Sequence, residues 1–392
     1  MESLYVESNE ESLYRRRERL SLQYALQLSS SPANPTFDMV FNPKLQDNFL
    51  LRPKTIPTFG IRIRSLREDL EIDPYQIEHI RLPHIPIWDM TGPTILYDLR
   101  AGKKSDVCPS EFQSRFHIIQ NKYDDHQFIY TDGSKEGDRV GCAVVCGRQC
   151  VMERLPDVAS IYTAELRAIY LALHHGIGST GDKFIICVDS LSCLQAIESL
   201  DIENPLVLSI LELHSTLKTL RKNVVFCWVP SHVGIRGNEL ADKAAKTALK
   251  GRKINIPLPF TDFRPIIKQY VREQWSDFWS LQSENKLHAV QPTLGCWERS
   301  CRERRREEIV LCRLRIGHSF LTHRYLLAGE DPPECISCQE RLTVDHILLH
   351  CSEYHHIREN YFQAETRKEL LENIAPDTIL NFLREAGLFF LI

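Results

Sequence analysis

The sequence has no long apolar run. None of its segments approaches the roughly 18 consecutive apolar residues that a membrane-spanning helix needs. Its opening, Met1–Glu10, also lacks the basic and apolar regions of a secretory signal. We therefore expect an intracellular protein with no membrane partner. The sequence does not distinguish the nucleus from the cytoplasm.

A strong excess of one charge is also absent. The formal net charge is −4, from 48 basic and 52 acidic residues, which excludes a uniformly basic nucleic-acid binder. Any contact with nucleic acid must therefore depend on local basic patches. A disulfide framework is not indicated either, because the 13 cysteines are odd in number and most occur singly in apolar segments. Reduced, buried thiols suit this pattern better.

The N-terminal part lacks the regular periods of a globular core. Residues 13–28 combine arginines with apolar residues at four-residue spacing, which predicts a basic amphipathic helix. The arginines of that helix have two possible explanations: they form a solvated face, or they contact phosphates. From Ser31 to Pro109 the chain contains ten of its 20 prolines. We interpret residues 1–125 as a connector, helical at first and then irregular or extended.

A different pattern begins at His126. The apolar run Phe128–Asp132 stops abruptly on an acid and predicts a central strand. Short runs at residues 140–146 and 149–155, joined by a turn at Gly147-Arg148, predict two further strands. These three strands should form an antiparallel meander.

Helices and strands then alternate. A helical period through residues 166–173 stops near Gly176. Strands are expected at residues 184–188 and 224–229, and helices at 190–200, 205–221 and 238–249. The predicted fold is α/β, with a mixed five-stranded sheet flanked by helices. We expect the strands that end at Asp189 and Val229 to be parallel neighbours of the first strand.

Four carboxylates occupy the ends and starts of these elements. Asp132 and Asp189 end apolar strands, Glu165 opens a helix, and Asp242 lies in the first turns of a late helix. Each has an ordinary explanation: an Asp-Gly turn for Asp132, or a favourable charge near a helix N-terminus capped by Asn238 for Asp242. Together, four acids converging on one sheet edge would form a site for divalent cations.

The blocks that contain these acids resemble a known family. Tyr130-Thr-Asp-Gly-Ser134, Thr163-Ala-Glu-Leu166, Val188-Asp-Ser190 and the stretch from Trp228 to Ala244 are similar to a type 1 ribonuclease H domain, over about residues 126–250. The four acidic blocks occur in the family's order. His232, ten residues before the last acid, also matches the family's pattern.

The resemblance implies a metal-dependent endonuclease that cleaves the RNA strand of RNA–DNA hybrids with two Mg²⁺ or Mn²⁺ ions. Asp132 would bridge both ions, Glu165 and Asp189 would complete one site, and Asp242 the other. His232 would aid proton transfer or product release.

The resemblance also implies contacts with the substrate. Ser134, Ser190 and Asn238 would meet strand backbones or 2′-hydroxyl groups, although Ser190 equally suits the cap of the next helix. The interval from Leu200 to Val224 lacks a basic, tryptophan-rich insertion that some members use to grip hybrids. Weak affinity of the isolated domain is therefore expected.

The next segment, residues 251–330, is interpreted as a basic helical connector. It contains Trp275, Trp279 and Trp297, and residues 296–324 carry eight arginines against four glutamates, a net charge of +4. Aromatic side chains beside arginines suit base stacking and phosphate contact, which makes single-stranded nucleic acid a second candidate partner. A mixed-charge solvated helix is the alternative.

A cysteine and histidine cluster follows. Its spacing, Cys-x2-Cys, seven residues, His-x4-Cys, is typical of a structural zinc site formed by Cys335, Cys338, His346 and Cys351. His350 competes with Cys351 as the fourth ligand. Because residues 331–358 are few and polar, zinc binding should supply much of their folding free energy. Residues 359–392 are expected to form a helical tail that packs on the preceding domain.

The flanking segments resemble parts of non-LTR retrotransposon polyproteins. The resemblance rests on Arg313-Leu-Arg-Ile-Gly-His318 with the cysteine cluster, and on Arg16-Arg-Glu-Arg-Leu with Tyr24 and Asn34-Pro35 near the end of a reverse transcriptase. The polymerase itself is missing. Tyr123-Asp-Asp125 is not its catalytic box, which has a residue between the tyrosine and the two acids and apolar strands on either side, and we interpret it as a polar loop. Two alternatives to an active ribonuclease H remain: a catalytically silent nucleic-acid-binding remnant, and an integrase or transposase.

Overall fold

The computed structural model describes the chain except residues 1, 45–48, 50, 52–54, 71, 73–75, 91, 101–106 and 297–301. Trp297 therefore lies outside the described residues. The chain divides into two compact units, one formed by Ser21–Ile267 and one by Met1–Leu20 with Lys268–Ile392. Within the described part of the chain, no helix is both long enough and apolar enough to cross a bilayer.

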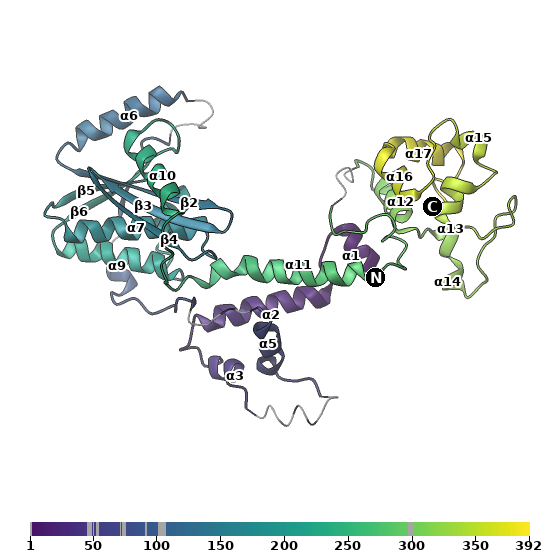
Figure 1. Ribbon diagram of the computed structural model, residues 1–392, viewed down its shortest axis with the longest axis horizontal. Helices are drawn as coiled ribbons and strands as arrows, with labels where there is room; N and C mark the ends of the chain where they lie inside the picture. The colour runs from purple at the N-terminus through teal and green to yellow at the C-terminus, as the bar shows by residue number, and fades with distance from the viewer. Residues whose placement is uncertain are drawn as a thin grey trace. The chain divides into compact units, whose positions relative to one another are not determined.

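A six-stranded mixed sheet forms the centre of the first unit, in the order β1-β6-β5-β2-β3-β4 (Figure 1). Five of its strands are those expected from the sequence: β2 (Gln127–Glu136), β3 (Arg139–Cys146), β4 (Gln149–Leu155), β5 (Lys183–Val188) and β6 (Asn223–Trp228). The first three are antiparallel, and β5 and β6 continue the sheet in parallel. The α/β class and the mixed sheet are confirmed.

Two features of the sheet differ from the expectation. First, β1 (Thr94–Leu96) pairs in parallel with β6 and adds a sixth strand, within the segment that its prolines marked as irregular. Second, β6 pairs with β5 and not with β2. The strand before Val229 cannot adjoin β2, because β3 and β5 already occupy both edges of β2.

Helices cover both faces of the sheet. On one face lie α6 (Pro109–Lys122) and α10 (Arg236–Ala248), and on the other lie α7 (Ile161–Gly178) and α9 (Pro205–Thr219) (Figure 1). The short α8 (Leu191–Glu198) packs against α7 and α9. Two apolar layers result, because β-strand side chains alternate between the faces.

The face under α6 and α10 shows why these helices pack there. Phe112 and Phe116 of α6 contact a cluster that includes Ile185 of β5 and Val225 of β6. In α10, small alanines pack close to Ala143 and Val145 of β3. The small residues let α10 lie close along β2 and β3, with Gly237 against the Tyr130 ring and Ala248 against Gly141.

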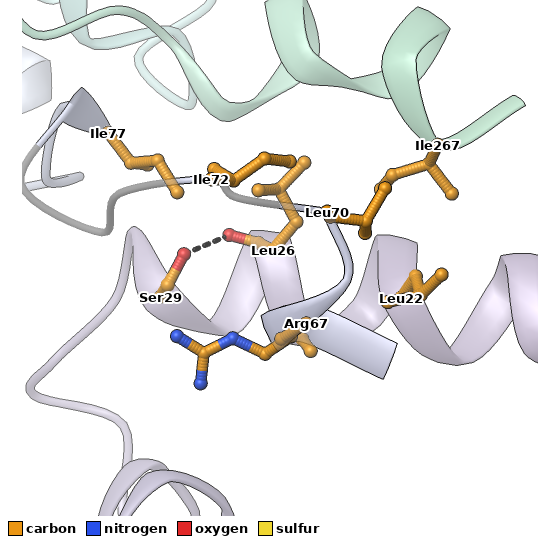
Figure 2. A pocket seen from close by; sticks show the side chains of 9 residues that line it. Leu22, Leu26, Ser29, Arg67, Leu70, Ile72, Ile77 and Ile267 are labelled. Carbon is orange, nitrogen blue, oxygen red and sulfur yellow. Dashed lines mark hydrogen bonds between the residues drawn. The ribbon is translucent and has the colours of Figure 1, made fainter. Parts of the chain in front are cut away.

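The first unit also contains α2 (Leu13–Ser29) from Ser21 onward, α3 (Phe37–Phe41), α5 (Phe59–Glu68) and a 3-10 turn at Ile87–Asp89. The helix predicted over residues 13–28 is therefore confirmed. Leu22 and Leu26 border a cavity of about 20 Å³, together with Arg67, Ile77 and Ile267 (Figure 2). A space of this size holds about one water molecule, so it is a packing gap and not a substrate site.

The second unit has its own apolar core. It contains α1 (Glu2–Ser8), most of α11 (Arg264–Ser280), α12 (Arg305–Ile316), α13 (Phe320–His323), α14 (Tyr325–Ala328), a π-helix (His346–His350), α15 (His355–Arg358), α16 (Arg367–Asn373) and α17 (Pro376–Glu385). Leu314 of α12, Ile347 of the π-helix and Leu380 of α17 belong to one buried cluster. The C-terminal tail therefore packs on the segments before it, as expected.

The tryptophans of α11 are part of this unit's interior. Trp275 and Trp279 are each 1% exposed and pack with Val6 and Leu287. The indole N–H of Trp279 donates to the carbonyl of Gln291 at 2.9 Å. The expectation that these two rings stack on bases is wrong, because their spacing of four residues puts them on the buried face of a helix.

Candidate active site

Two of the predicted acids lie side by side on neighbouring parallel strands, Asp132 within β2 and Asp189 directly after β5. Tyr130 of β2 pairs with Cys187 of β5, so Asp132 and Asp189 each follow two residues later at the same edge. One carboxylate oxygen from each of these acids and from Glu165 lies within 4.8 Å of the other two. The structure thus brings together three of the four predicted carboxylates.

Glu165 reaches this edge because α7 approaches β2 very closely. A Cβ atom added to Gly133 would lie 2.9 Å from the Glu165 backbone nitrogen and 3.1 Å from its carboxyl carbon. Only glycine permits this approach. Gly133 lies within β2 and not in a turn, so the ordinary explanation of Asp132-Gly133 as a turn is wrong.

The fourth acid, Asp242, belongs to an adjacent group. Its carboxylate lies within 4.8 Å of ligand atoms of His232 and Glu239, and it accepts a hydrogen bond from the Lys246 ammonium at 2.8 Å. His232 is exposed and adopts a left-handed backbone conformation with φ of 55°. Glu239 was not predicted, although it lies one turn before Asp242 and accepts the Gly234 backbone N–H at 3.2 Å.

Burial and mutual repulsion disfavour the charged forms of the central acids. Burial raises the pKa of Asp132 to about 8, and Asp189 and Asp242 add to the effect against the opposing Lys246. Burial, followed by Asp189 and Asp132, also raises the pKa of Glu165 well above its usual range. The pKa of Asp189 is raised chiefly by burial. The cluster therefore needs a positive partner to be fully ionised.

Two oxygens in the cluster have no hydrogen-bond partner. They are Oδ2 of Asp132 and Oε2 of Glu165, and both are buried. Unpaired buried carboxylate oxygens are unfavourable unless a cation neutralises them. The donor set consists of oxygens alone, which suits Mg²⁺ or Mn²⁺. The residues present therefore fit a divalent cation.

Comparison with known proteins identifies this part of the chain. The family model described as RNase H matches residues 124–250. Residues 124–250 form an RNase H domain. The Pol polyproteins of equine infectious anemia virus, strain Wyoming and isolate 1369, are each 37% identical over 127 residues. That match covers 30% of this chain and 10% of each viral protein, so the chain corresponds to about a tenth of the length of these relatives.

Asp262, which lies beyond the matched range, makes hydrogen bonds that hold part of the RNase H domain in place. Asp262 lies in a 3-10 turn (Phe260–Phe263), is 5% exposed, and accepts hydrogen bonds from the hydroxyls of Ser160 at 2.8 Å and Thr163 at 2.9 Å. Ser160 in turn caps α7 by accepting the Thr163 N–H at 3.1 Å. Asp262 thus secures the first turn of the helix that carries Glu165. An acid flanked by two phenylalanines was the available sequence signal.

The predicted substrate-binding residues have different surroundings. Ser134 is half-buried on β2, two residues beyond Asp132. Ser190 precedes α8 but makes no side-chain cap, and its hydroxyl donates to the Cys193 sulfur at 3.1 Å. Asn238 is 3% exposed and donates to Asp189 Oδ2 at 3.4 Å. The expected cap by Asn238 is wrong, because the N-cap of α10 is Ile235.

In the second unit the structure brings the predicted cysteine and histidine cluster together. Ligand atoms of Cys335, Cys338, His346 and Cys351 lie within 4.8 Å of one another. The Cys351 sulfur is 3.6 Å from that of Cys335, and the buried Nε2 of His346 has no hydrogen-bond partner. His350 is exposed and is not part of this group. Three sulfurs and one imidazole fit a tetrahedral zinc ion.

The segment that contains this cluster is not isolated from the core. Val344, Ile347 and Leu348 are buried with residues of α12 and α17. The expectation that the segment has no apolar core is wrong. Its dependence on zinc for folding stays a prediction. The C-terminal tail supplies the apolar partners that residues 331–358 lack.

Proposed function

We propose that the RNase H domain is a metal-dependent endonuclease of type 1 that hydrolyses the RNA strand of RNA–DNA hybrids. The observation that carries the proposal is the meeting of two buried carboxylates, Asp132 and Glu165, with the half-buried Asp189, within a domain that matches the RNase H family. The two buried acids each have an unpaired oxygen. Such a cluster is unfavourable by itself and becomes favourable when divalent cations bind.

Each acid has a proposed role. Asp132 would contact two ions, Glu165 and Asp189 would complete one site, and Asp242 would complete the other. Bound Mg²⁺ or Mn²⁺ would lower the pKa of water and neutralise charge on the leaving oxygen. The chain's own contribution is to hold the four carboxylates at the sheet edge and to exclude water from two of them.

Neighbouring polar side chains extend this site. His232 lies in an exposed loop beside Asp242 and Glu239, where its ring can accept a proton from the reaction or release one to the product. Asn238 would orient Asp189 through its amide. Ser134 and Ser190 would meet the nucleic-acid backbone or a 2′-hydroxyl, the group by which RNA differs from DNA.

The rest of the chain fits a piece of a retroelement polyprotein, of the non-LTR type. In this proposal residues 1–125 are a remnant of the end of a reverse transcriptase, residues 126–250 are the nuclease, and residues 251–330 are a basic connector. Residues 331–358 would bind one structural zinc ion through Cys335, Cys338, His346 and Cys351, and residues 359–392 would support that module.

The test uses the full chain with end-labelled RNA–DNA hybrid, duplex RNA and duplex DNA in the presence of Mg²⁺. Cleavage confined to the RNA of the hybrid supports the proposal. Cleavage of duplex DNA instead would indicate an integrase-like nuclease, and binding without cleavage would indicate a silent remnant; either result contradicts it. Asp132→Asn should be inactive, whereas Asp201→Asn, the same change at an exposed position outside the site, should cleave as the wild type does.

A further inference from the structure

A group of basic side chains converges in the second unit, outside the zinc ligands. His318 and His323 stack with ring centroids 3.9 Å apart and an interplanar angle of 16°. The ammonium of Lys286 lies 2.8 Å from Nε2 of His323. The Arg341 guanidinium donates to the hydroxyl of Tyr325, whose ring is 6.0 Å from that of His323. Three separate segments thus bring four basic groups together.

The backbone around this group is held firmly. Thr322 is 1% exposed, forms a capping box with Ser319, and has its hydroxyl 2.7 Å from Nδ1 of His323. The guanidinium of Arg367, which is 6% exposed, donates to the Lys286 carbonyl at 2.7 Å. The basic groups are therefore fixed by buried neighbours and do not meet by chance at flexible chain ends.

In this arrangement the positive charges of Lys286, Arg341 and Arg367 face one another and disfavour protonation of the two histidines. Burial, then Arg341 and Arg367, lowers the pKa of Lys286. Burial, then His318, Lys286 and Arg341, lowers the pKa of His323 to about 4. The carboxylate of Asp345, 3.3 Å from Nε of Arg367, opposes part of this effect because it raises the pKa of Lys286. An anion bound between the basic groups would relieve this repulsion.

Lys286, His318 and Arg341 are exposed, so a ligand can reach them. Arg341 offers a planar fork of donors and Lys286 a point charge, the combination that suits phosphate oxygens. The charge pattern thus favours a phosphate group over a neutral polar ligand.

We propose that Lys286, His318, His323 and Arg341 bind a phosphate group of a single-stranded nucleic acid. A strand is favoured over free phosphate because aromatic rings accompany the cations. Phe320 is 55% exposed beside the Arg324 guanidinium, which lies 5.7 Å from its ring centroid. Exposed rings beside arginines provide stacking surfaces for bases.

The surface continues from this group along α12. His318 also borders a hollow of about 720 Å³ between α1 and α12, whose walls carry Arg305, Arg313 and Arg315 as well as Glu7 and Glu308. A strand anchored at Lys286 and His323 can therefore meet further cations along the same unit. This site replaces the buried Trp275 and Trp279 as the nucleic-acid contact of the C-terminal basic region, and it does not depend on the nuclease activity.

The experiment measures binding of a fluorescein-labelled single-stranded DNA to the full chain by anisotropy, over a range of salt concentrations and without Mg²⁺. Lys286→Gln and Arg341→Gln should each weaken binding about tenfold and reduce the slope of log affinity against log salt by roughly one phosphate contact. Lys268→Gln, which removes an exposed lysine elsewhere in the unit, should bind as the wild type does. Because Lys286 faces other cations, Lys286→Gln should melt no lower than the wild type.

A second readout distinguishes the possible ligands. Binding of the DNA should raise the pKa of His323, followed by NMR of the imidazole, whereas a purely structural cluster would be unaffected. If inorganic phosphate shifts His323 but the oligonucleotide binds no better than phosphate, the strand assignment is wrong. Equal binding by Lys286→Gln, Arg341→Gln and Lys268→Gln would overturn the site altogether.

Discussion

Asp132 occupies a position where its negative charge is unfavourable without a cation. It is 5% exposed, its Oδ2 has no partner, and burial and three neighbouring acids raise its pKa to about 8. An unfolded aspartate has a pKa near 4, so the folded chain holds the proton more tightly than the unfolded chain. The acidic cluster is therefore a source of instability whenever no cation neutralises it.

This leads to a prediction for Asp132→Asn with the divalent cations removed. Below about pH 4 the wild type and the variant should be equally stable, because Asp132 is neutral in both the folded and the unfolded chain. As pH rises toward about 8 the wild type should lose stability relative to the variant, by at most about 1.4 kcal/mol per pH unit. Thermal unfolding at several pH values measures the difference.

Mg²⁺ provides the control for that experiment. It should raise the melting temperature of the wild type and have little effect on Asp132→Asn, because an ion that binds the folded state stabilises it by mass action. A difference in stability that does not change with pH would contradict the predicted role of the Asp132 charge.

Gly133 provides a test of geometry without a change of charge. In Gly133→Ala the new Cβ would lie 2.9 Å from the Glu165 backbone nitrogen, so α7 must move away from β2. We expect a loss of about 1–3 kcal/mol of stability and a fall in the rate of hybrid cleavage. Gly178→Ala is the matched control, since nothing lies within 4 Å of its added Cβ. Equal activity of the two variants would show that the close approach is unimportant.

The residues of the site differ in how far the sequence predicts them. The sequence predicts Asp132 and Asp189 because each interrupts an apolar run. The expected parallel pairing of their strands then places both acids at one edge of the sheet. Glu239 is not visible, because its place beside Asp242 depends on a loop in which His232 adopts a left-handed conformation. Asn238 looks like a helix cap, and only the tertiary structure shows its contact with Asp189.

At the scale of elements, the first turn of α7 depends on a segment far along the chain. Asp262 is buried and accepts two hydroxyl hydrogen bonds there, and burial raises its pKa while those bonds lower it. The 3-10 turn of residues 260–263 thus holds the helix that presents Glu165. Residues beyond the family match therefore contribute to the geometry of the active site.

We predict that Asp262→Ala lowers stability by about 1–3 kcal/mol, because the buried Thr163 hydroxyl and the half-buried Ser160 hydroxyl lose their acceptor. The maximal rate of hybrid cleavage should fall more than the apparent affinity for hybrid, since Asp262 positions Glu165 and does not touch the substrate. A double-mutant cycle with Thr163→Val measures the coupling by chemical denaturation. Additive effects of the two substitutions would contradict a direct role for the Asp262–Thr163 bond.

The boundaries of the strands also differ in how well the sequence predicts them. The strands from β2 to β6 carry clear apolar runs, and the predicted limits of β3 to β6 agree closely with the structure. The expected end of the first strand at Asp132 is wrong, because β2 continues to Glu136 in its antiparallel pairing with β3. β1 has three residues, Thr94 to Leu96, and follows a proline, so no period can be read from it. It becomes a strand because the edge of β6 offers unpaired backbone groups.

For the whole molecule, the main consequence concerns the second unit. Its core combines α12, the π-helix, α16 and α17, so the segment with the cysteine cluster is held by apolar contacts as well as by any metal. The sequence suggests dependence on zinc because residues 331–358 are polar when considered alone. Their partners come from the strongly apolar end of the chain, including Leu388 and Ile392.

Because of these apolar contacts, we expect removal of zinc to open only the cysteine segment and not to unfold the whole second unit. The Cys335→Ser and Cys338→Ser double variant should lose a stoichiometric zinc ion, and protease sites should open near residues 331–342, which lie before the π-helix. The helices α12, α16 and α17 should keep their circular dichroism signal, because Leu314, Ile347 and Leu380 stay packed together. Hybrid cleavage should persist, since the proposed nuclease residues lie in the other unit.

Mass spectrometry under native conditions and limited proteolysis measure these outcomes. His350→Asn is the control that should keep zinc, because His350 is exposed and outside the cluster. Complete unfolding of the second unit in the double variant would show that the metal, and not the apolar core, holds it together.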